Sequence, residues 1–385
     1  MRCLDGVDIN DQRVGLRLDL NVPIKNGTIL DNTRIIASIP SIEYLLERNC
    51  KILIISHLGR PKEDTFEQKY SLTPVCNSLS NILGTKIKLI TTLGEAFQSN
   101  EKIFLLENIR FFIGEKDNSF ELSDAVANTI DAYVFDAFGT AHRKHASTYG
   151  VIQKCSNSYA GLLVEKEVKN LTKALFNFRS PLISIIGGSK ISTKLGVIQK
   201  LCDISDFIIT GGGITNNLLL SKGFEIGKSI FEEEMKDTSK KILENNNILL
   251  PDMVIASKSL SNQGSLKSVE DVEPDEMILD IRISNEMSKA LSQAKTILWN
   301  GPLGVFENEN FELGTKFLCK SIAELDDCFV VAGGGETISA INKFISTKDI
   351  SYCSTAGGAF LEFVEGKELP SLEALGFKKE EEKND

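Results

Sequence analysis

Arginine and histidine side chains follow several short apolar runs in the first half of the chain, where they could act together on an anion. The chain has only three histidines, His57, His142 and His145, and each lies within three residues of an arginine. Guanidinium groups offer paired N–H donors that match the oxygens of a phosphate or carboxylate group. The polar segments that end the runs are Asp19–Asn21, His57–Arg60, Glu107–Arg110 and Asp136–Arg143.

Five arginines are candidates for an anion site: Arg17, Arg34, Arg60, Arg110 and Arg143. Any one of them alone is as well explained as a surface ion-pair partner, which contributes little to stability. As a group they stand in strand-end segments, and a doubly wound sheet brings such segments to one edge. We therefore expect them to converge on a phosphate or carboxylate group.

Asp19 and Asn21 place hydrogen-bond acceptors among these bases. Asp19 could simply neutralise Arg17 or Arg34, which would be a structural role. Alternatively, Asp19 and Asn21 accept hydrogen bonds from a substrate hydroxyl, and the ligand is then a small phosphorylated hydroxy acid. The sequence supports these two interpretations about equally.

Glycine takes the place of arginine at the strand ends of the second half. The segments are Gly187–Lys190, Gly211–Gly213, Asn300–Pro302, Gly333–Glu336 and Ser354–Gly358. A glycine-rich turn that opens a helix presents backbone N–H groups and the positive end of the helix dipole to an anion. One such turn could equally cap a helix or tighten a loop. Their recurrence, with Lys190 and Lys194 after the first, predicts a site for nucleotide phosphates.

Glu336 directly follows three glycines at the expected start of a helix. An acid in the first turn stabilises the helix dipole, which would be a structural role. Beside a nucleotide it is the best candidate for a Mg²⁺ ligand, because Mg²⁺ usually takes one or two carboxylates together with phosphate oxygens.

Strands must position these loops, and nine short runs rich in leucine and β-branched residues are candidates. Longer stretches with helical spacing separate the runs, which is typical of parallel sheets covered by helices. The predicted fold class is therefore α/β. The predicted strands are Val14–Leu20, Lys51–Ser56, Lys102–Leu106, Ala132–Phe135, Leu182–Ile186, Phe207–Thr210, Thr296–Trp299, Cys328–Ala332 and Ile350–Cys353.

The length of 385 residues exceeds what one hydrophobic core usually supports, so we expect two domains. A helical pattern begins at Gly161 and ends before Arg179, where a new strand starts. We predict a first domain over residues 1–160, an interdomain helix within 161–180 and a second domain over 181–368.

Composition excludes several classes of protein. The net charge of −10 argues against general nucleic-acid binding. No run of about 18 apolar residues and no signal-peptide pattern is present, so we expect neither a membrane span nor secretion by that route. The eight cysteines never form a C-x-x-C pair, which favours reduced thiols in a cytoplasmic protein.

Taken in order, the motifs resemble the phosphoglycerate kinase family over essentially the whole chain. The sequence of Gly187–Lys194 is similar to that of the bacterial branch of the family. The matching segments are Arg17–Pro23, Ser56–Pro61, Asp136–Arg143, Gly187–Lys194, Trp299–Glu307 and Gly333–Thr337. The resemblance implies two doubly wound, Rossmann-like domains facing a central cleft, with residues 369–385 packing back onto the first domain. It implies transfer of a phosphoryl group between 1,3-bisphosphoglycerate and ADP, with Mg²⁺ as the cofactor, in a monomer.

The resemblance also implies a role for each matching residue. In the first domain, His57, Arg60, Arg110 and Arg143 would hold the 3-phosphate, and Asp19, Asn21 and Arg34 the glycerate end. In the second domain, Lys190 and Lys194 would contact phosphates, Glu307 the ribose, and Gly188, Gly212, Gly334, Gly335 and Thr337 the nucleotide. Glu336 would bind Mg²⁺, and Gly357 and Gly358 would present amides to the phosphoryl group in transfer. Arg34 and Lys190 would supply catalytic charge.

Three positions depart from the family pattern. The family usually has Asp at the position of Glu336 and Gly at the positions of Arg282 and Ala356. These departures motivate one rival, a catalytically weakened homologue that binds nucleotide as a regulatory or interaction protein. A second rival is a nicotinamide-dependent oxidoreductase, against which the absence of G-x-G-x-x-G at Gly211 weighs.

Overall fold

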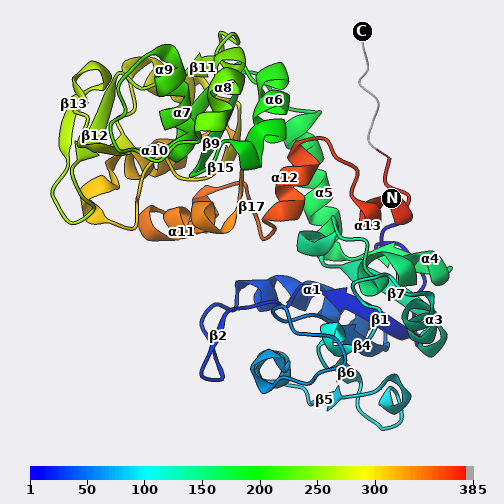
Figure 1. Cartoon of the computed structure of the whole chain (residues 1–385). Coiled ribbons are helices and arrows are strands. Elements are labelled where there is room, and N and C mark those ends of the chain that lie inside the picture. Colours follow the sequence, from blue (N-terminus) through cyan, green and yellow to red (C-terminus); the bar gives the residue numbers. More distant parts are fainter. Residues whose placement is uncertain (379–385) are drawn as a thin grey trace. The chain divides into compact units, whose positions relative to one another are not determined.

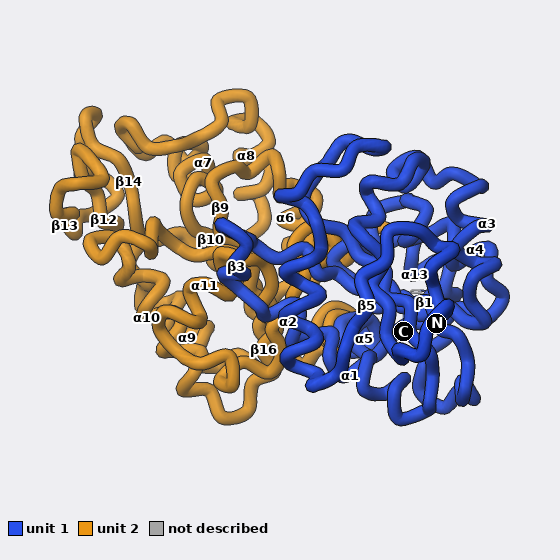
Figure 2. The backbone as a smooth tube through the Cα atoms, turned by 90° about the horizontal axis from the view of Figure 1, so that it is seen from below, with its two compact units in different colours: residues 1–169, 368–385 blue, residues 170–367 orange. Residues whose placement is uncertain are grey.

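The computed structural model describes residues 1–378 and divides the chain into two compact units. Unit 1 contains Met1–Lys169 together with the segment from Glu368 onward, and unit 2 contains Asn170–Lys367 (Figure 2). The division falls within α5 (Leu162–Leu175), the helix predicted between the domains. Part of the segment 369–385, expected to pack on the first domain, namely 379–385, lies outside the described residues.

Unit 1 is built on a six-stranded parallel sheet. Its strands are β1 (Arg13–Leu18), β4 (Lys51–Ile55), β5 (Ile87–Ile90), β6 (Ile103–Leu106), β7 (Ala132–Asp136) and β8 (Ser158–Ala160), in the order β5-β6-β4-β1-β7-β8. Every residue of β6 and β7 is buried, as expected for strands covered by helices on both faces. The chain order reverses between β1 and β7, and ligands bind at such a point in open α/β sheets.

Helices and short turns connect these strands. The α-helices of unit 1 are α1 (Thr33–Glu47), α2 (Thr73–Leu83), α3 (Phe120–Thr129), α4 (Val151–Lys154) and α13 (Pro370–Ala374). The strands β2 (Ile24–Lys25) and β3 (Thr28–Ile29) form a small hairpin. Three single turns matter for the site: η3 (Ile109–Phe111), η4 (Phe138–Thr140) and the π-helical η5 (Ala146–Gly150).

Helix α13 returns to unit 1 after the whole of unit 2. It contacts η5 and α4, and Ser371 N donates a hydrogen bond to Ala141 O (3.2 Å). Arg2 N donates to Leu375 O (2.9 Å), so the two ends of the described chain lie side by side. Figure 1 shows the red α13 next to the blue N-terminus.

Unit 2 is built on a second six-stranded parallel sheet. Its strands are β9 (Leu182–Gly188), β10 (Phe207–Gly211), β11 (Ile248–Leu249), β15 (Thr296–Asn300), β16 (Phe329–Gly333) and β17 (Tyr352–Ser354), in the order β11-β10-β9-β15-β16-β17. The helices are α6 (Leu195–Ile204), α7 (Gly212–Lys222), α8 (Lys236–Ile242), α9 (Asn285–Gln293), α10 (Leu313–Ala323), α11 (Gly335–Phe344) and α12 (Gly358–Val364).

The sequence-based prediction of an α/β fold with two parallel sheets is confirmed. All nine predicted strands are present, with ends displaced by at most two residues. The prediction did not include the antiparallel sheet of unit 2, whose strands are β12 (Met253–Ser257), β13 (Ser265–Ser268) and β14 (Met277–Ile281). Within residues 1–378, no helix has the length and apolar character needed to cross a membrane.

Candidate active site

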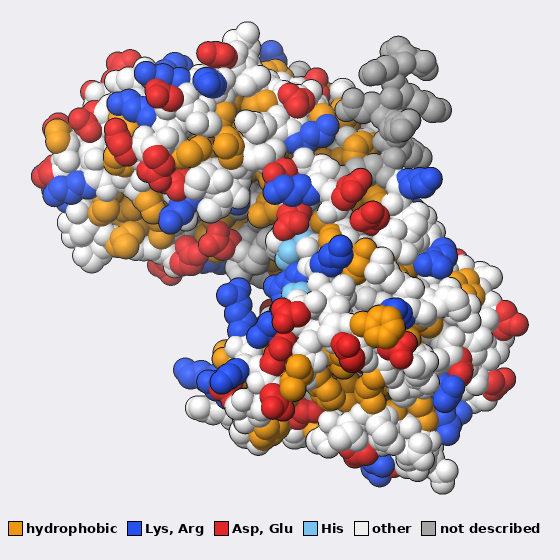
Figure 3. Space-filling model, turned by 45° about the vertical axis from the view of Figure 1, so that its right-hand side comes forward, with side chains coloured by type: hydrophobic (Ala, Val, Ile, Leu, Met, Phe, Trp, Pro, Cys, Tyr) orange, Lys and Arg blue, Asp and Glu red, His pale blue; other side chains and the backbone are white. Residues whose placement is uncertain are grey.

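The residues predicted for the anion site of unit 1 lie where four neighbouring strands end. Because β6, β4, β1 and β7 are adjacent and parallel, their carboxyl ends meet at one edge of the sheet. Backbone bonds join the loops that follow, including Ile109 N to Ser56 O (3.0 Å). In Figure 3, histidine side chains (pale blue) lie next to Lys and Arg side chains (blue) on the face shown.

Arg34 reaches the loop after β1 from the first turn of α1. Its guanidinium donates to Asp19 Oδ1 (3.1 Å) and to the backbone carbonyl of Asn21 (3.1 Å), and the Arg34 and Asp19 side chains are 33% and 12% exposed. The Asn21 amide oxygen accepts from Gly59 N (2.9 Å), which fixes the loop after β4. These three predicted residues therefore form one connected, partly open group.

His57 and Arg17 lie deeper and in contact. Arg17 is 1% exposed and His57 is 2% exposed. Arg17 Nε donates to Ser147 Oγ (2.9 Å), and another guanidinium nitrogen lies 3.3 Å from His57 Nδ1. Burial, followed by the charges of Arg17 and Arg110, holds the pKa of His57 well below its usual value. His57 is therefore neutral at physiological pH.

Arg110 and Arg143 complete a concentration of positive charge. Arg110 lies on η3 and is buried, and burial followed by the charges of Arg143 and Arg17 lowers its pKa to about 10. Burial also lowers the pKa of Arg143, although Asp19 opposes this shift. Arg60 lies in the loop after β4 and is exposed. Clustered cations that depress one another's pKa are what an anion would stabilise.

The other two histidines lie near the cluster in the loop after β7. Burial, followed by the charge of Arg143, lowers the pKa of His142. Burial, followed by the charges of Arg110 and Arg143, lowers the pKa of His145 to about 4. Neither histidine therefore adds positive charge at neutral pH.

A buried carboxyl group that was not among the predicted site residues lies next to the cluster. Glu115 is 1% exposed, and its two oxygens accept from Ser147 N (2.9 Å) and Ser147 Oγ (2.7 Å). Burial raises the pKa of Glu115, while Arg17 acts in the opposite direction. In sequence Glu115 stands in the polar stretch after η3, and only the fold shows that it is buried.

The glycines at the strand ends of unit 2 serve two different purposes. At Gly187 and Gly301 the backbones of neighbouring loops touch, so a Cβ on Gly187 would collide with Pro302 O and one on Gly301 with Gly187 O. Around Gly335 and Gly357, by contrast, a Cβ would meet no atom within 4 Å. The first kind packs the strand ends together, and the second has open space where a side chain would lie.

Lys194 and Asn300 connect the ends of three strands. The Lys194 ammonium donates to Gly187 O and to Asn300 Oδ1, and Asn300 Nδ2 donates to Gly333 O (2.7 Å). Burial lowers the pKa of Lys194 to about 8, although Glu336 opposes the shift. Asn300 was predicted only as part of a strand end, so its place as the central link is a finding of the structure.

The remaining predicted residues of unit 2 lie around α11 and nearby loops. Glu336 is in the first turn of α11 and is exposed, as are Lys190 and Glu307. The buried Thr337 hydroxyl donates to Gly333 O (2.8 Å) and accepts from Gly301 N (2.7 Å), so it is engaged within the protein. Gly188, Gly212 and Gly334 lie in the same strand-end turns, and Gly358 begins α12.

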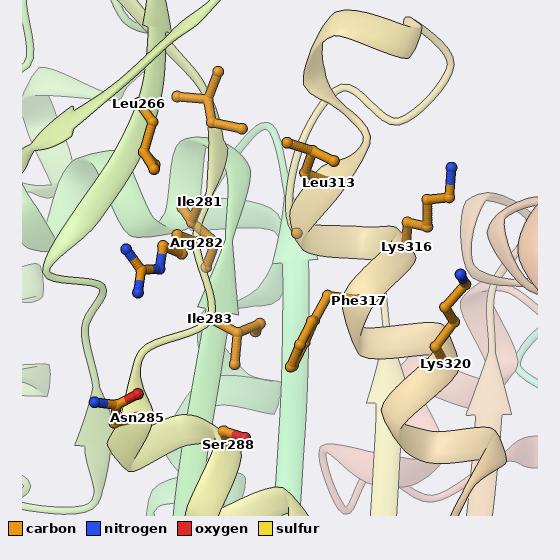
Figure 4. A pocket seen from close by; sticks show the side chains of 12 residues that line it. Leu266, Ile281, Arg282, Ile283, Asn285, Ser288, Leu313, Lys316, Phe317 and Lys320 are labelled. Atoms are coloured by element: carbon orange, nitrogen blue, oxygen red, sulfur yellow. The ribbon is translucent and has the colours of Figure 1, made fainter.

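Two of the departures from the family pattern have simple structural contexts. Ala356 is buried, and its N–H donates to Ser354 Oγ (3.2 Å). Arg282 follows β14 and lines a pocket of about 550 Å³. The apolar walls of this pocket are Ile255, Leu266, Ile281, Ile283, Leu313 and Phe317. Figure 4 shows the Arg282 guanidinium pointing away from Phe317. The positive charge of Arg282 therefore does not lie against this apolar side chain.

The predicted site residues therefore form two groups, one in each unit. Asp19, Asn21, Arg34, His57 and Arg110 come together in unit 1 with Arg60 and Arg143 nearby. Lys194 lies with the glycine turns and Glu336 in unit 2. Within residues 1–378, no group of three or more His, Cys, Asp or Glu side chains could hold a metal ion alone.

Comparison with known proteins matches this arrangement to one family. The family model for phosphoglycerate kinase matches residues 4–367. The chain is 44% identical over 374 residues to the phosphoglycerate kinase of Vibrio campbellii and 45% identical over 382 residues to that of Francisella philomiragia. These alignments cover 96% and 97% of this chain and 97% of each relative.

Solved structures agree with the sequence matches. The phosphoglycerate kinase of Coxiella burnetii superposes with a TM-score of 0.90 at 40% identity, over 97% of this chain and 98% of that one. The enzyme of Pyrococcus horikoshii gives 0.83 at 30% identity, over 98% of both chains. The chain therefore belongs to the phosphoglycerate kinase family.

Proposed function

We propose how the residues of the two units share the reaction of this family. As a member, the chain is a kinase that moves a phosphoryl group between 1,3-bisphosphoglycerate and ADP, giving 3-phosphoglycerate and ATP in glycolysis. Unit 1 binds the phosphoglycerate and unit 2 the nucleotide. The observation that carries this division is the cluster of buried arginines in unit 1, set against the open glycine turns of unit 2.

In unit 1, the 3-phosphate binds to His57, Arg60, Arg110 and Arg143. The depressed pKa values of Arg110 and Arg143 support this assignment, because an anion offsets the mutual repulsion of these groups. Asp19 and Asn21 bind the glycerate end. Arg34 bonds to both in the free protein, so a substrate hydroxyl that reaches Asp19 releases guanidinium donors toward the carboxyl phosphate.

In unit 2, the nucleotide phosphates bind to the amides of Gly334 and Gly335 and to Lys194, and Glu307 binds the ribose. Gly188, Gly212 and Thr337 shape this pocket from the strand-end turns. The open space at Gly335 supports the assignment, because a phosphate can approach the amide there.

Mg²⁺ is assigned to Glu336 together with nucleotide phosphate oxygens. The single exposed carboxylate suits this ion, since Mg²⁺ commonly takes one or two carboxylates and completes its shell with phosphates and water. When bound, the ion neutralises phosphate charge. The longer side chain of Glu336, compared with the family's usual Asp, reaches a ligand from the first turn of α11.

Catalysis requires positioning and positive charge, and it requires no general base. The attacking oxygen belongs to an already ionised phosphate or carboxylate, so the protein need only align it and stabilise the charge on the transferring group. Arg34 and Lys190 supply mobile positive charge, and the amides at Gly357 and Gly358 supply fixed donors. Excluding water during transfer protects the acyl phosphate from hydrolysis.

We further propose that the enzyme works as a monomer in the cytoplasm. Its eight cysteines are free thiols, which is consistent with a reducing compartment. Mass measurement in solution by light scattering tests the monomer directly.

A coupled assay of ATP formation tests the proposed function. The purified full chain is supplied with 1,3-bisphosphoglycerate, ADP and Mg²⁺, and ATP is expected to form. Arg143→Ala should then weaken 3-phosphoglycerate binding and Lys194→Ala ADP binding, each sparing the other ligand. Arg13→Ala is the matched control, because Arg13 pairs with Asp131 at the opposite end of β1. No ATP formation, or equal loss of both ligands in either variant, contradicts the proposal.

A further inference from the structure

The buried groups beneath the arginine cluster form a chain of contacts that ends at His57. We propose that Glu115, Ser147 and Arg17 are positioning residues that hold His57 in one neutral tautomer, with its proton on Nε2, so that this N–H donates to the bound phosphate. The inference rests on the proposed role of unit 1 in binding the phosphoglycerate.

The tautomer follows from the contact between Arg17 and His57. A guanidinium carries only N–H donors and stays protonated, so the nitrogen that it faces must accept. That nitrogen is His57 Nδ1, at 3.3 Å, and the ring proton of neutral His57 therefore lies on Nε2. Protonating Nδ1 would turn a donor and a positive charge toward Arg17. The low pKa of His57, caused first by burial and then by Arg17, agrees with this arrangement.

The second step is the orientation of Arg17 itself. Its Nε donates to Ser147 Oγ (2.9 Å), and one terminal nitrogen donates to Leu18 O. With these two directions fixed, the other terminal nitrogen points at His57. Arg17 is 1% exposed, so water does not compete for these donors.

The third step is the direction of the Ser147 hydroxyl. Ser147 Oγ donates to one Glu115 oxygen (2.7 Å), which leaves the hydroxyl lone pairs for Arg17 Nε. Ser147 N donates to the other Glu115 oxygen (2.9 Å), and the Tyr133 hydroxyl donates to Ser147 O. Ser147 lies in η5, and single π-helical turns occur frequently at functional sites.

The His57 ring therefore has one nitrogen held by protein and one left for a ligand. Within the described residues His57 Nε2 makes no hydrogen bond, whereas Nδ1 faces Arg17. The cations that lower the His57 pKa also include Arg110, Arg143 and Arg34. A neutral donor at this point adds a directed hydrogen bond to the phosphate without adding another charge to that crowded group.

Nitrogen NMR of the ligand-free full chain, labelled with ¹⁵N-histidine, tests the tautomer without any change to the site. With only three histidines, His57→Gln identifies the His57 signals by their loss. We expect a protonated Nε2 and a bare Nδ1 at pH 7. A protonated Nδ1, or a doubly protonated ring, would overturn the proposal, whether or not the protein forms ATP.

His142 provides an internal control, because it is expected to adopt the opposite tautomer. Arg143 Nε donates to His142 Nε2 (3.4 Å), so the same reasoning places the proton of His142 on Nδ1. If both histidines show the same tautomer, arginine contact does not set the tautomer in this protein. The proposal then fails.

Substitutions test the chain of contacts. Ser147→Ala and Glu115→Gln should convert the single His57 tautomer into a mixture and raise the KM for 3-phosphoglycerate by roughly tenfold, with the KM for ADP within about twofold. A pure Nε2–H signal in folded Ser147→Ala protein would remove Ser147 and Glu115 from the proposal.

Two replacements of His57 separate its nitrogens. In His57→Gln the side-chain amide takes the place of Nε2, and in His57→Asn it takes the place of Nδ1. We expect the Gln variant to bind 3-phosphoglycerate more tightly than the Asn variant. Tighter binding by the Asn variant would contradict donation from Nε2.

Discussion

Arg34 shows how one side chain can be engaged in the free protein and still be available for catalysis. Its guanidinium bonds to Asp19 and to the carbonyl of Asn21, yet the side chain remains 33% exposed. The contact with Asp19 is a charge-assisted bond at the protein surface, which is weak enough to exchange for a ligand. Its positive charge should matter most where charge develops on the transferring phosphoryl group.

We predict that Arg34→Ala lowers kcat by roughly 100-fold while changing the Kd for 3-phosphoglycerate by less than about fivefold. The ATP-forming assay gives kcat, and isothermal titration gives the Kd. Loss of binding with turnover unchanged would assign Arg34 to ground-state binding instead.

Lys194 should impose a pH dependence on nucleotide binding. With a pKa of about 8, its ammonium is charged below that pH and neutral above it. Binding an anion favours the charged form, so ADP affinity should be constant below pH 8 and fall as pH rises above it, by at most tenfold per pH unit. Lys194→Arg keeps the charge and should flatten the profile between pH 7 and pH 9.5. An equal fall in both proteins would exclude Lys194 as the group responsible.

The sequence predicted the charged residues of the site better than the groups that orient them. Arginine and histidine at strand ends are visible from residue type and position alone. Glu115 and Ser147 have no such signal, because their roles depend on burial and on a π-helical turn that brings them under Arg17. Asn300 was predicted to end a strand. Its hydrogen bonds to Lys194 and to Gly333 O, which connect β9 with β16, are visible only in the folded structure.

At the scale of the elements, the glycine turns of unit 2 allow a matched pair of substitutions. Gly357→Ala adds a methyl group to open space, whereas Gly187→Ala drives one into the carbonyl of Pro302. We expect Gly187→Ala to lower the free energy of unfolding by about 1–3 kcal/mol or more. Gly357→Ala should leave stability nearly unchanged and reduce turnover, because the proposed function places the transferring phosphoryl group at this turn.

Chemical denaturation and the ATP-forming assay separate these outcomes. Full activity in Gly357→Ala would show that the turn before α12 does not approach the substrates.

The start of α11 gives the test for the metal. Glu336→Gln should weaken Mg²⁺-ADP binding much more than metal-free ADP binding, because the amide is a poorer ligand for a hard cation. If Glu336 acts only on the helix dipole, the change costs about 0.3–1 kcal/mol of stability and the effect of Mg²⁺ stays the same. Glu121→Gln, the same change in the first turn of α3 in unit 1, is the control. ADP titrations with and without Mg²⁺ decide between the two roles.

Nine of the twelve strands of the two parallel sheets were predictable because they are short apolar runs that are largely buried. Strands without that signature were missed. In β13 three of the four residues are polar and two of the four are exposed, and β8 has only three residues. Their assignment as strands depends on the partners they pair with, which local sequence does not specify.

At the scale of the whole molecule, α13 makes unit 1 depend on residues that follow unit 2. Leu372 and Leu375 are buried, and α13 packs on η5, the turn that carries Ser147. We predict that a chain of residues 1–367 loses stability in unit 1 and loses 3-phosphoglycerate affinity, while ADP affinity is kept. A chain of residues 1–378, which retains α13, is the control. Scanning calorimetry with each ligand assigns the transitions, and an unchanged unit 1 transition in the shorter chain would contradict the prediction.

The return of α13 also orders events during synthesis. The ribosome makes the chain from the N-terminus, so all six strands of the unit 1 sheet emerge before any strand of unit 2. Leu372 in α13 and Leu375 directly after it are translated only after Lys367, when unit 2 is complete. Unit 1 therefore begins to form first and is finished last. Until then, the nascent first unit exposes the apolar surface that α13 will cover.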